Sequence, residues 1–308
     1  MNNLSLRQLS TEVYPSELAE KYNPLWHYRL KFIARSLFYK SSLQKLVYGI
    51  EPTLLNTLCK RHNRFIEKPF RPYITNTAAP SQRVTFITQH YQFISNELPS
   101  ATKERIFANH NGLKLTSFIV DDEEYSLNLT FDGRYQKEGE LCLVLFDAKG
   151  NNFYTVTFIV NNQDDRRSII IGGLQGPASN DENNLKIKRL TKTLHGQRPK
   201  DLMIKMMTFI ANCWHIDHLL AIKNESHTYC AKRYKSKKYG NSRIKTDYNR
   251  HWEALSGTEY DEHFYQLPME DVRRDPEDIS RPKRAMYRRR YEWLDQVKTE
   301  IQQTIALK

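Results

Sequence analysis

The stretch that decides the fold begins with IIIGGLQG (Ile169–Gly176) and ends with HLLAIK (His218–Lys223). Both segments have the composition of buried strands. Between them, periodicity predicts a polar helix near Asn183–Leu194 and an apolar helix over Pro199–His215, joined by the hexapeptide HGQRPK (His195–Lys200). A strand, a helix and a second strand at this separation favour a parallel crossover connection. We therefore expect a parallel strand pair in the sheet.

The hexapeptide HGQRPK places a glycine and two cations at the start of the predicted apolar helix. Gly196 allows a sharp turn, and Pro199 suits the first helical position because its missing N–H would lack a partner there. Free backbone N–H groups and the helix dipole favour negative charge at such a start. Arg198 would add a planar fork and Lys200 a mobile point charge. These features predict an anion site; alternatively, glycine and proline only separate two helices and the cations face water.

An antiparallel meander is predicted before this stretch. Near Gly112 the hydrophobic period changes from helical to extended, and Asp-Gly, Lys-Glu-Gly and Ala-Lys-Gly-Asn-Asn turns separate the apolar segments. The expected strands are Leu113–Val120, Tyr125–Phe131, Leu141–Phe146, Phe153–Val160 and Ser168–Ile171. Their short connections indicate neighbouring strands that run in opposite directions.

The first third of the chain has a helical pattern. Expected helices span Pro24–Ile50, Thr53–Arg61 and Gln82–Leu98, with an extended proline-containing link over Phe65–Pro80. The first of these segments has an apolar face interleaved with cations, which could lie on an anionic membrane. We expect this face to dock onto the rest of the protein instead.

Together these elements predict an α+β fold. A helical N-terminal region, residues 1–110, is expected to precede an α+β domain, residues 111–308, with a mixed, largely antiparallel sheet and packed helices. After the crossover we expect a further helix, a hairpin near Trp252–Leu267 and a basic terminal helix from Pro282 onward. At 308 residues, with 39% hydrophobic residues, the chain is long enough to bury a sizeable core.

The charge indicates an anionic partner. The formal net charge is +12 and the isoelectric point is near 9.4, which favours nucleic acid, a phospholipid surface, lipopolysaccharide or a phosphorylated cofactor. Lys232–Arg250 holds eight cations against Asp247 alone, and Arg281–Arg290 holds six cations and no acid. Nucleic acid is the less favoured partner because no zinc finger, KH-type loop or RNA-recognition aromatic pair is present. A solvated basic helix face would give the same clusters.

Targeting signals are not evident. No run of about 18 apolar residues predicts a membrane span, and the first ten residues lack the charged and apolar parts of a secretory signal. We therefore expect a cytoplasmic protein that can also contact the inner membrane peripherally. The four cysteines are scattered without a C-x-x-C pair, which predicts reduced core thiols and no metal site.

Five ordered blocks of the sequence resemble the VirK/YbjX family of Gram-negative bacteria. The blocks are IGGLQG (Ile171–Gly176), LHGQRPK (Leu194–Lys200), AIKNESH (Ala221–His227), DYNRHWE (Asp247–Glu253) and SRPKRAMYRRRY (Ser280–Tyr291). The resemblance runs from about Pro24 to the end of the chain. It implies a role in outer-envelope modification, in surface display of a virulence protein, or in resistance to cationic antimicrobial peptides. It implies no reaction and supplies no catalytic residues.

The order of elements also resembles the acyl-CoA N-acyltransferase (GNAT) architecture. In that superfamily a Q/R-x-x-G-x-G/A loop before a helix holds the pyrophosphate of CoA, so the resemblance implies acyl-CoA or another phosphorylated acyl donor at Gly196, Arg198 and Lys200. The chain departs from the pattern because Arg198 stands where the second small residue belongs, and because a helix is inserted after Gly176. A resemblance in fold does not by itself establish activity.

Candidate catalytic residues follow from side-chain chemistry and position. His195 and His227 flank the expected cofactor helix and the end of the central strand, where ligands gather in open α/β sheets, and either could serve as the base. Further candidates are Asp247, Tyr248 and Glu253 for proton transfer, Asn224 for orienting a carbonyl and Trp252 for walling an acyl pocket. For each residue, the alternative is a structural hydrogen bond or a packed ring.

Two readings without catalysis remain. As an adaptor, the protein would bind anionic lipid, another anionic envelope component or a protein partner through its basic clusters and N-terminal helix. As a nucleic-acid-binding protein, it would neutralise phosphates with the same clusters, and its affinity would fall steeply with salt.

Overall fold

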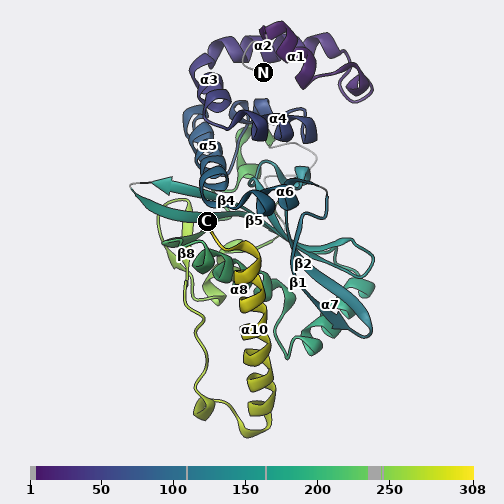
Figure 1. Cartoon of the computed structure of the whole chain (residues 1–308), viewed down its shortest axis with the longest axis vertical. Coiled ribbons are helices and arrows are strands. Elements are labelled where there is room, and N and C mark those ends of the chain that lie inside the picture. Colours follow the sequence, from purple (N-terminus) through teal and green to yellow (C-terminus); the bar gives the residue numbers. More distant parts are fainter. Residues whose placement is uncertain (1–4, 109, 164, 235–243, 245) are drawn as a thin grey trace.

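Helices form one end of the molecule (Figure 1). The computed structural model describes residues 5–108, 110–163, 165–234, 244 and 246–308. The helices of the first third are α1 (Leu6–Val13), α2 (Leu25–Phe38), α3 (Lys40–Tyr48), α4 (Pro52–Arg61), α5 (Pro80–Glu97) and α6 (Ser100–Ala108), with the 3₁₀ segment η2 (Phe65–Phe70) between α4 and α5. Helix α4 begins where the Glu51 carboxylate accepts hydrogen bonds from two backbone N–H groups, with Pro52 as its first residue.

An eight-stranded mixed sheet follows within the described residues, in the order β1-β2-β3-β4-β5-β6-β8-β7. The strands are β1 (Leu113–Val120), β2 (Glu123–Thr130), β3 (Leu141–Phe146), β4 (Asn152–Gln163), β5 (Arg166–Gln175), β6 (His218–Ile222), β7 (Thr258–Glu259) and β8 (Phe264–Leu267). Neighbouring strands are antiparallel except β5 and β6, which pair in parallel from Ser168 and His218 to Ile171 and Ala221. The predicted meander, parallel crossover and closing hairpin are therefore confirmed.

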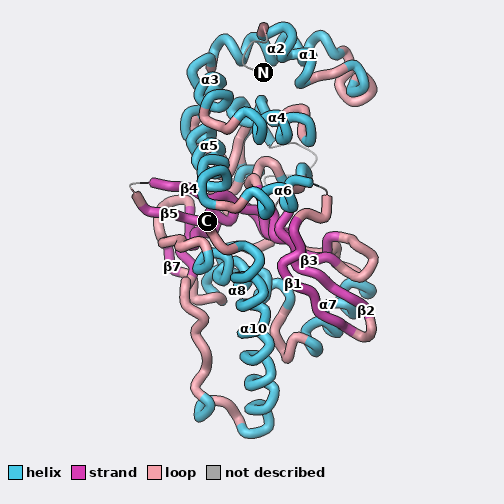
Figure 2. Tube along the Cα trace, in the orientation of Figure 1, coloured by secondary structure: helices cyan, strands magenta, loops and turns pink. Residues whose placement is uncertain are grey.

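Helices cover both faces of the sheet (Figure 2). Helix α5 packs on one face, and α8 (Pro199–Cys213) and α10 (Arg284–Ile305) pack on the other, with α7 (Asp181–Thr193) beside α8. All six residues of β3 are buried, as expected of a strand covered on both faces. Leu141, Leu143 and Leu145 join the main core, whereas the alternate residues form a smaller cluster on the opposite face. The predicted α+β class is confirmed.

The N-terminal helices differ most from the sequence prediction. The segment expected to run from Pro24 to Ile50 divides at Tyr39, whose φ of −112° and ψ of 38° interrupt α2 and α3. The Tyr39 ring stacks on Phe70 of η2 at 6.0 Å, a tertiary contact that a local pattern does not contain. Helices α1 and α6 were not predicted; each has fewer than ten residues, so its apolar period is short.

The four cysteines are thiols that form no disulfide within the described residues, with Cys59 and Cys142 buried and Cys213 and Cys230 half-buried. Within the described residues, none of the helices combines the length and apolar character needed to span a bilayer.

Candidate functional site

The candidate site begins where β5 and β6 separate. Their pairing stops at Ile171 and Ala221, although β5 continues to Gln175. Beyond that point, the Tyr248 hydroxyl donates to the Leu174 carbonyl at 3.2 Å and accepts from the Leu174 N–H at 3.1 Å. Tyr248 is the first residue of α9 (Tyr248–Ala254) and is fully buried. A side chain from a separate helix therefore satisfies backbone groups of β5 where β6 no longer pairs with it.

Four aromatic rings form a column beside this tyrosine. Tyr229 stacks on His227 at 5.5 Å, His227 on Tyr248 at 5.6 Å, and Tyr248 on Trp252 at 5.6 Å. The Trp252 indole N–H donates to the Ile222 carbonyl at the end of β6. At these centroid distances each ring is stacked with an offset on the next, which is a favourable geometry for aromatic pairs. Three of the predicted site residues, His227, Tyr248 and Trp252, are therefore neighbours in this column.

His227 also faces a buried carboxyl group. Its Nε2 lies 3.6 Å from Oε1 of Glu138, and each side chain is 1% exposed. The backbone N–H of Tyr229 donates to His227 Nδ1, so the neutral ring carries its proton on Nε2. Burial lowers the pKa of His227 to about 4 and raises the pKa of Glu138 to about 7. Near neutral pH the pair is therefore a neutral imidazole beside a carboxyl group that titrates, which is a suitable proton donor or acceptor.

Glu138 depends on the glycine pair of β5. A Cβ at Gly172 would overlap the Glu138 carbonyl oxygen, and a Cβ at Gly173 would overlap its carboxylate. Gln175 donates to the same carboxylate at 3.2 Å. The IGGLQG block thus makes room for Glu138 and supplies its hydrogen-bond partner.

The remaining predicted residues around α9 make structural hydrogen bonds. Asn224 Oδ1 accepts from the backbone N–H groups of Tyr248 and Asn249, and its amide donates to the Thr246 carbonyl. Asp247 is the N-cap of α9 and accepts from the Arg250 N–H. Glu253 is exposed and accepts from the Tyr265 hydroxyl at 2.9 Å. These contacts hold α9, and with it Tyr248, against the sheet.

The HGQRPK hexapeptide ends α7 and begins α8. His195 and Gly196 have φ values of 52° and 80°, and Pro199 occupies the first turn of α8, as predicted. Arg290 of α10 donates from Nε and Nη2 to the His195 carbonyl at 2.9 and 2.5 Å. This contact places His195 next to α10, whereas His227 lies in the buried column.

The two cations of the hexapeptide differ in exposure. Arg198 is exposed, and Lys200 is half-buried, with its pKa lowered by burial. Asp201 already places a negative charge in the first turn of α8. The helix start therefore carries a protein carboxylate alongside its two cations.

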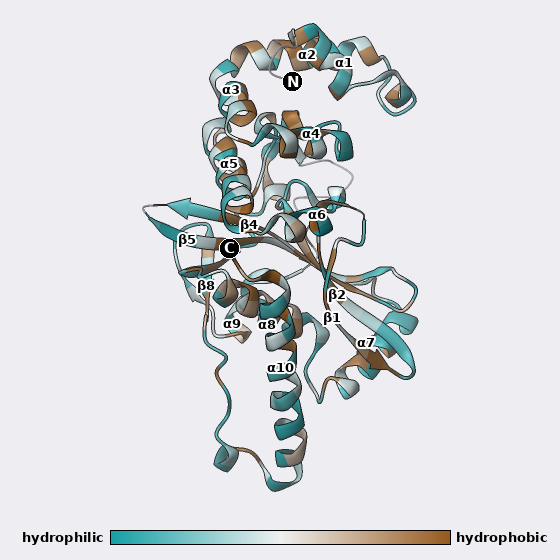
Figure 3. Ribbon diagram, viewed as in Figure 1, coloured by the Kyte–Doolittle hydropathy of each residue, from teal (hydrophilic) through white to brown (hydrophobic). Residues whose placement is uncertain are grey.

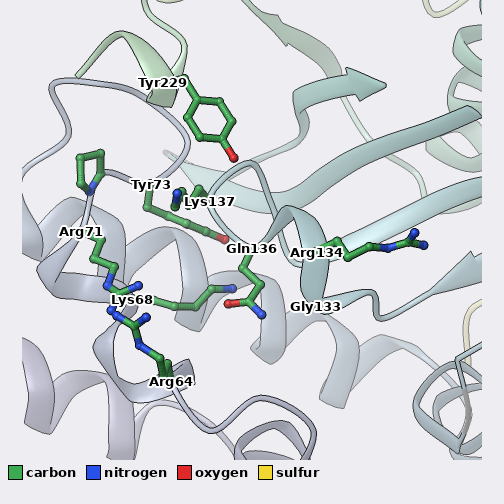
Figure 4. A pocket seen from close by; sticks show the side chains of 10 residues that line it. Arg64, Lys68, Arg71, Tyr73, Gly133, Arg134, Gln136, Lys137 and Tyr229 are labelled. Atoms are coloured by element: carbon green, nitrogen blue, oxygen red, sulfur yellow. The ribbon is translucent and has the colours of Figure 1, made fainter. Parts of the chain in front are cut away.

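A small pocket lies between η2 and the connection from β2 to β3 (Figure 4). Its volume is about 100 Å³. Five cations line it, namely Arg64, Lys68 and Arg71 from the helical region and Arg134 and Lys137 from the β2–β3 connection. Lys68 and Gln136 point into the space, whereas the Arg134 side chain extends away from it. The ammonium group of Lys137 lies 4.9 Å from the centre of the Tyr229 ring.

Buried carboxylates hold part of this cationic lining in place. Glu67 accepts from Tyr14 and from both Arg64 and Arg71. Glu140 accepts from Lys68, Tyr73 and Tyr91. The carboxylates are largely saturated by these donors, and Arg71 Nε, which is buried, has no hydrogen-bond partner within the described residues. Within the described residues, the carboxylates of Glu67, Glu140 and Asp132 pair with four of the five lining cations.

The pocket and the ring column meet at Tyr229. Tyr229 lines the pocket and stacks on His227, and Lys137 precedes Glu138 in the chain. Neither Glu138 nor His227 lines the pocket. Sequence reasoning identified His227 and Tyr248 but not Glu138, Tyr229 or the pocket cations. The signal for Glu138 and Glu140 was KEGE (Lys137–Glu140), which has the composition of a turn but places two carboxylates directly before a buried strand.

Among the described residues, no cation of the two predicted basic clusters lines this pocket. Of the cluster Lys232–Arg250, the cations Lys235, Lys237, Lys238, Arg243 and Lys245 lie outside the described residues. Arg233 donates to the Phe70 carbonyl. The cluster Arg281–Arg290 occupies the 3₁₀ segment η7 (Arg281–Lys283) and the start of α10, which projects from the sheet (Figure 1). There Arg284 donates to the Ile279 carbonyl.

Comparison with known sequences identifies the class of protein. The chain belongs to the family described as "Protein of unknown function (DUF535)", which matches residues 24–303. It is 31% identical to the uncharacterized protein YbjX of Escherichia coli strain K12, over 90% of this chain and 84% of that protein. It is 26% identical to an uncharacterized protein of Haemophilus influenzae, over 89% of each chain. The resemblance to the VirK/YbjX family is therefore confirmed. No solved structure matches the chain.

Proposed function

We propose that this protein binds a phosphorylated or similarly anionic ligand in the pocket between η2 and the β2–β3 connection, and that this binding supports modification of the outer envelope. The observation that carries the proposal is the gathering of Arg64, Lys68, Arg71 and Lys137, from two regions far apart in sequence, around one pocket. Within the described residues, Glu67 and Glu140 pair with three of these cations, so two negative charges face three positive ones. A space of about 100 Å³ suits one phosphate-sized group with the rest of its ligand outside.

The chemistry of the lining favours phosphate or sulfate esters. Guanidinium groups present planar forks to such oxygens, and the Lys68 and Lys137 ammonium groups act as point charges. The Tyr229 ring lines the same pocket. The proposed envelope role rests on what the resemblance to the VirK/YbjX family implies. That resemblance also implies virulence-protein display and antimicrobial-peptide resistance.

Acyl transfer is a second candidate function. The observation that favours it is Glu138, a carboxyl group whose pKa is about 7, next to His227 and one residue from a pocket cation. In such a reaction an amine or hydroxyl would attack the acyl carbonyl of a donor such as acyl-CoA. The bond from carbonyl carbon to sulfur would break, and the acceptor's proton would pass by way of Glu138 to the leaving thiolate. Gly196, Arg198 and Lys200 remain candidates for holding the donor phosphates.

The pocket is tested by ligand-dependent thermal stability. Pyrophosphate, CoA, acyl-CoA and lipopolysaccharide fragments are titrated into the parent and into Lys137→Gln with Arg71→Gln. We expect pyrophosphate to raise the Tm of the parent and to bind the double variant at least about tenfold more weakly. Lys137→Gln alone keeps both ion pairs of Glu67. This single variant replaces the double variant in the titration if the double variant unfolds.

The matched control removes two exposed cations elsewhere, with Lys60→Gln and Arg166→Gln. Equal losses in both double variants would show that net charge alone is responsible and would contradict the proposal. Protection by acyl-CoA beyond that by CoA, together with release of thiol in the presence of an amine, supports the transferase candidate. A steep dependence of oligonucleotide binding on salt, without protection by small phosphates, supports the nucleic-acid alternative.

A further inference from the structure

Helix α2 has two apolar faces, of which the structure buries one. Phe32 is fully buried, and Leu25 and Tyr28 pack against the same core. Trp26, Leu30 and Leu37 point elsewhere and are 64%, 57% and 61% exposed. Positions 26, 30 and 37 fall on one side of an α-helix because their spacing of four and seven residues is close to whole turns.

The exposed apolar surface extends past the end of α2. Phe38 is 84% exposed, and Tyr48 at the end of α3 is 67% exposed. We call Trp26, Leu30, Leu37, Phe38 and Tyr48 the α2–α3 apolar surface. Figure 3 shows hydrophobic residues along α2, at the end of the molecule remote from α10. Nothing in the described ranges of the chain covers these side chains.

The same segment is purely cationic. Between Leu25 and Tyr48 there are five cations, Arg29, Lys31, Arg35, Lys40 and Lys45, and no acid. Arg29 donates to the Tyr14 carbonyl and Lys45 to the Thr85 hydroxyl. Lys31, Arg35 and Lys40 form no ion pair within the part of the chain that the structure describes. Within the described residues, no carboxylate therefore neutralises the charges of these three side chains.

We infer that the α2–α3 apolar surface docks on an anionic phospholipid membrane, with its aromatic and aliphatic side chains at the acyl boundary and its cations at the headgroups. Tryptophan prefers the membrane interface, and cations near an anionic leaflet each add to binding. The combination of an apolar stripe with neighbouring unpaired cations is that of an interfacial helix. This inference is independent of the ligand proposed for the pocket.

Vesicle partitioning of the full chain tests the inference. Vesicles of phosphatidylglycerol and phosphatidylcholine in equal amounts are compared with pure phosphatidylcholine. Leu30→Gln, Leu37→Gln and Phe38→Gln are combined, which keeps Trp26 as a fluorescent reporter. We expect parent binding to the anionic vesicles with a blue shift of tryptophan emission, and binding at least about tenfold weaker in the triple variant.

A matched control carries Ile119→Gln, Leu185→Gln and Val272→Gln, which alter three exposed apolar residues outside α2 and α3. This control should bind within about twofold of the parent. Lys31→Gln with Lys40→Gln should weaken binding to anionic vesicles and leave the folded state unchanged by circular dichroism. Equal binding to both vesicle types, or equal losses in the two triple variants, would overturn the inference. The inference would also be overturned if the parent bound no vesicles, formed a dimer, and became a monomer in the α2 triple variant. In that case the α2–α3 apolar surface would be an interface between two copies of the chain.

Discussion

Glu138 and His227 face each other across 3.6 Å inside the protein, and they carry opposite pKa shifts. Both shifts arise first from burial, which disfavours the charged form of each group. A carboxyl group next to an imidazole would form an ion pair in water. Here the neutral forms are favoured instead, so a proton added to or removed from this pair costs free energy of folding.

The first prediction concerns pH. The pKa of Glu138 is raised from 4.5 to about 7, so its contribution to stability is complete below about pH 4.5 and is lost as pH rises through 7. Glu138→Gln removes this loss. Its stability relative to the parent should increase from pH 5 to pH 8 by on the order of 3 kcal/mol. Urea unfolding of the parent and of Glu138→Gln at several pH values measures this difference in the free energy of unfolding. A difference that does not change with pH would contradict the titration of Glu138.

The second prediction concerns the glycine pair. Gly173→Ala would force a methyl group onto the Glu138 carboxylate and should cost about 2–3 kcal/mol of stability. Adding Glu138→Ala removes the overlapping atoms, so the double variant should lose less than the sum of the two single variants. Chemical denaturation of all four proteins gives this coupling. Strict additivity would show that Gly173 is required for some other reason.

The third prediction concerns the hydroxyl group that satisfies β5. Tyr248→Phe leaves the buried N–H and carbonyl of Leu174 without the Tyr248 partner and should cost about 1–3 kcal/mol. Tyr48→Phe removes an equivalent hydroxyl from an exposed position and should change stability by less than about 0.5 kcal/mol. If both substitutions have the same small effect, the contact with Leu174 contributes little.

The fourth prediction separates backbone strain from the Arg290 contact. Gly196 and Gly150 have similar φ values of 80° and 75°, but only at Gly196 would an added Cβ lie close to side chains, with Arg290 at 2.9 Å and Met286 at 3.3 Å. Both alanine variants should lose about 1 kcal/mol from strain. Gly196→Ala should lose more, and the excess should become smaller in the presence of Arg290→Ala, which removes the nearest side chain. Thermal unfolding measures the loss of stability in each variant. Equal losses in Gly196→Ala and Gly150→Ala would assign the whole loss to backbone strain.

Local patterns were sufficient for the sheet but not for the site. Strand β1 at Leu113–Val120 and strand β3 at Leu141–Phe146 have the predicted bounds because their apolar runs end at turn residues. The parallel crossover could be predicted because two strands joined by a helical connection usually pair in parallel. Glu138 could not be assigned this way, since its burial depends on Gly173 and His227, which lie far along the chain.

Contacts between distant segments also explain the other differences. Tyr39 was expected within a helix because nothing in its neighbours marks a break, and its partner Phe70 belongs to another segment. The five pocket cations had no common motif, because three come from η2 and its flanks and two from the β2–β3 connection. The anion site at HGQRPK, with Gly196, Arg198 and Lys200, stays a prediction.

The ring column gives the protein an internal optical reporter. Trp252 is buried at one end of the column, and Tyr229 stands at the pocket at the other end. A ligand that tilts the outer ring would alter the packing of two intervening rings before it reached the indole. Emission from Trp252, isolated by replacing the other three tryptophans with phenylalanine, would therefore register occupancy of a pocket that the indole itself never touches.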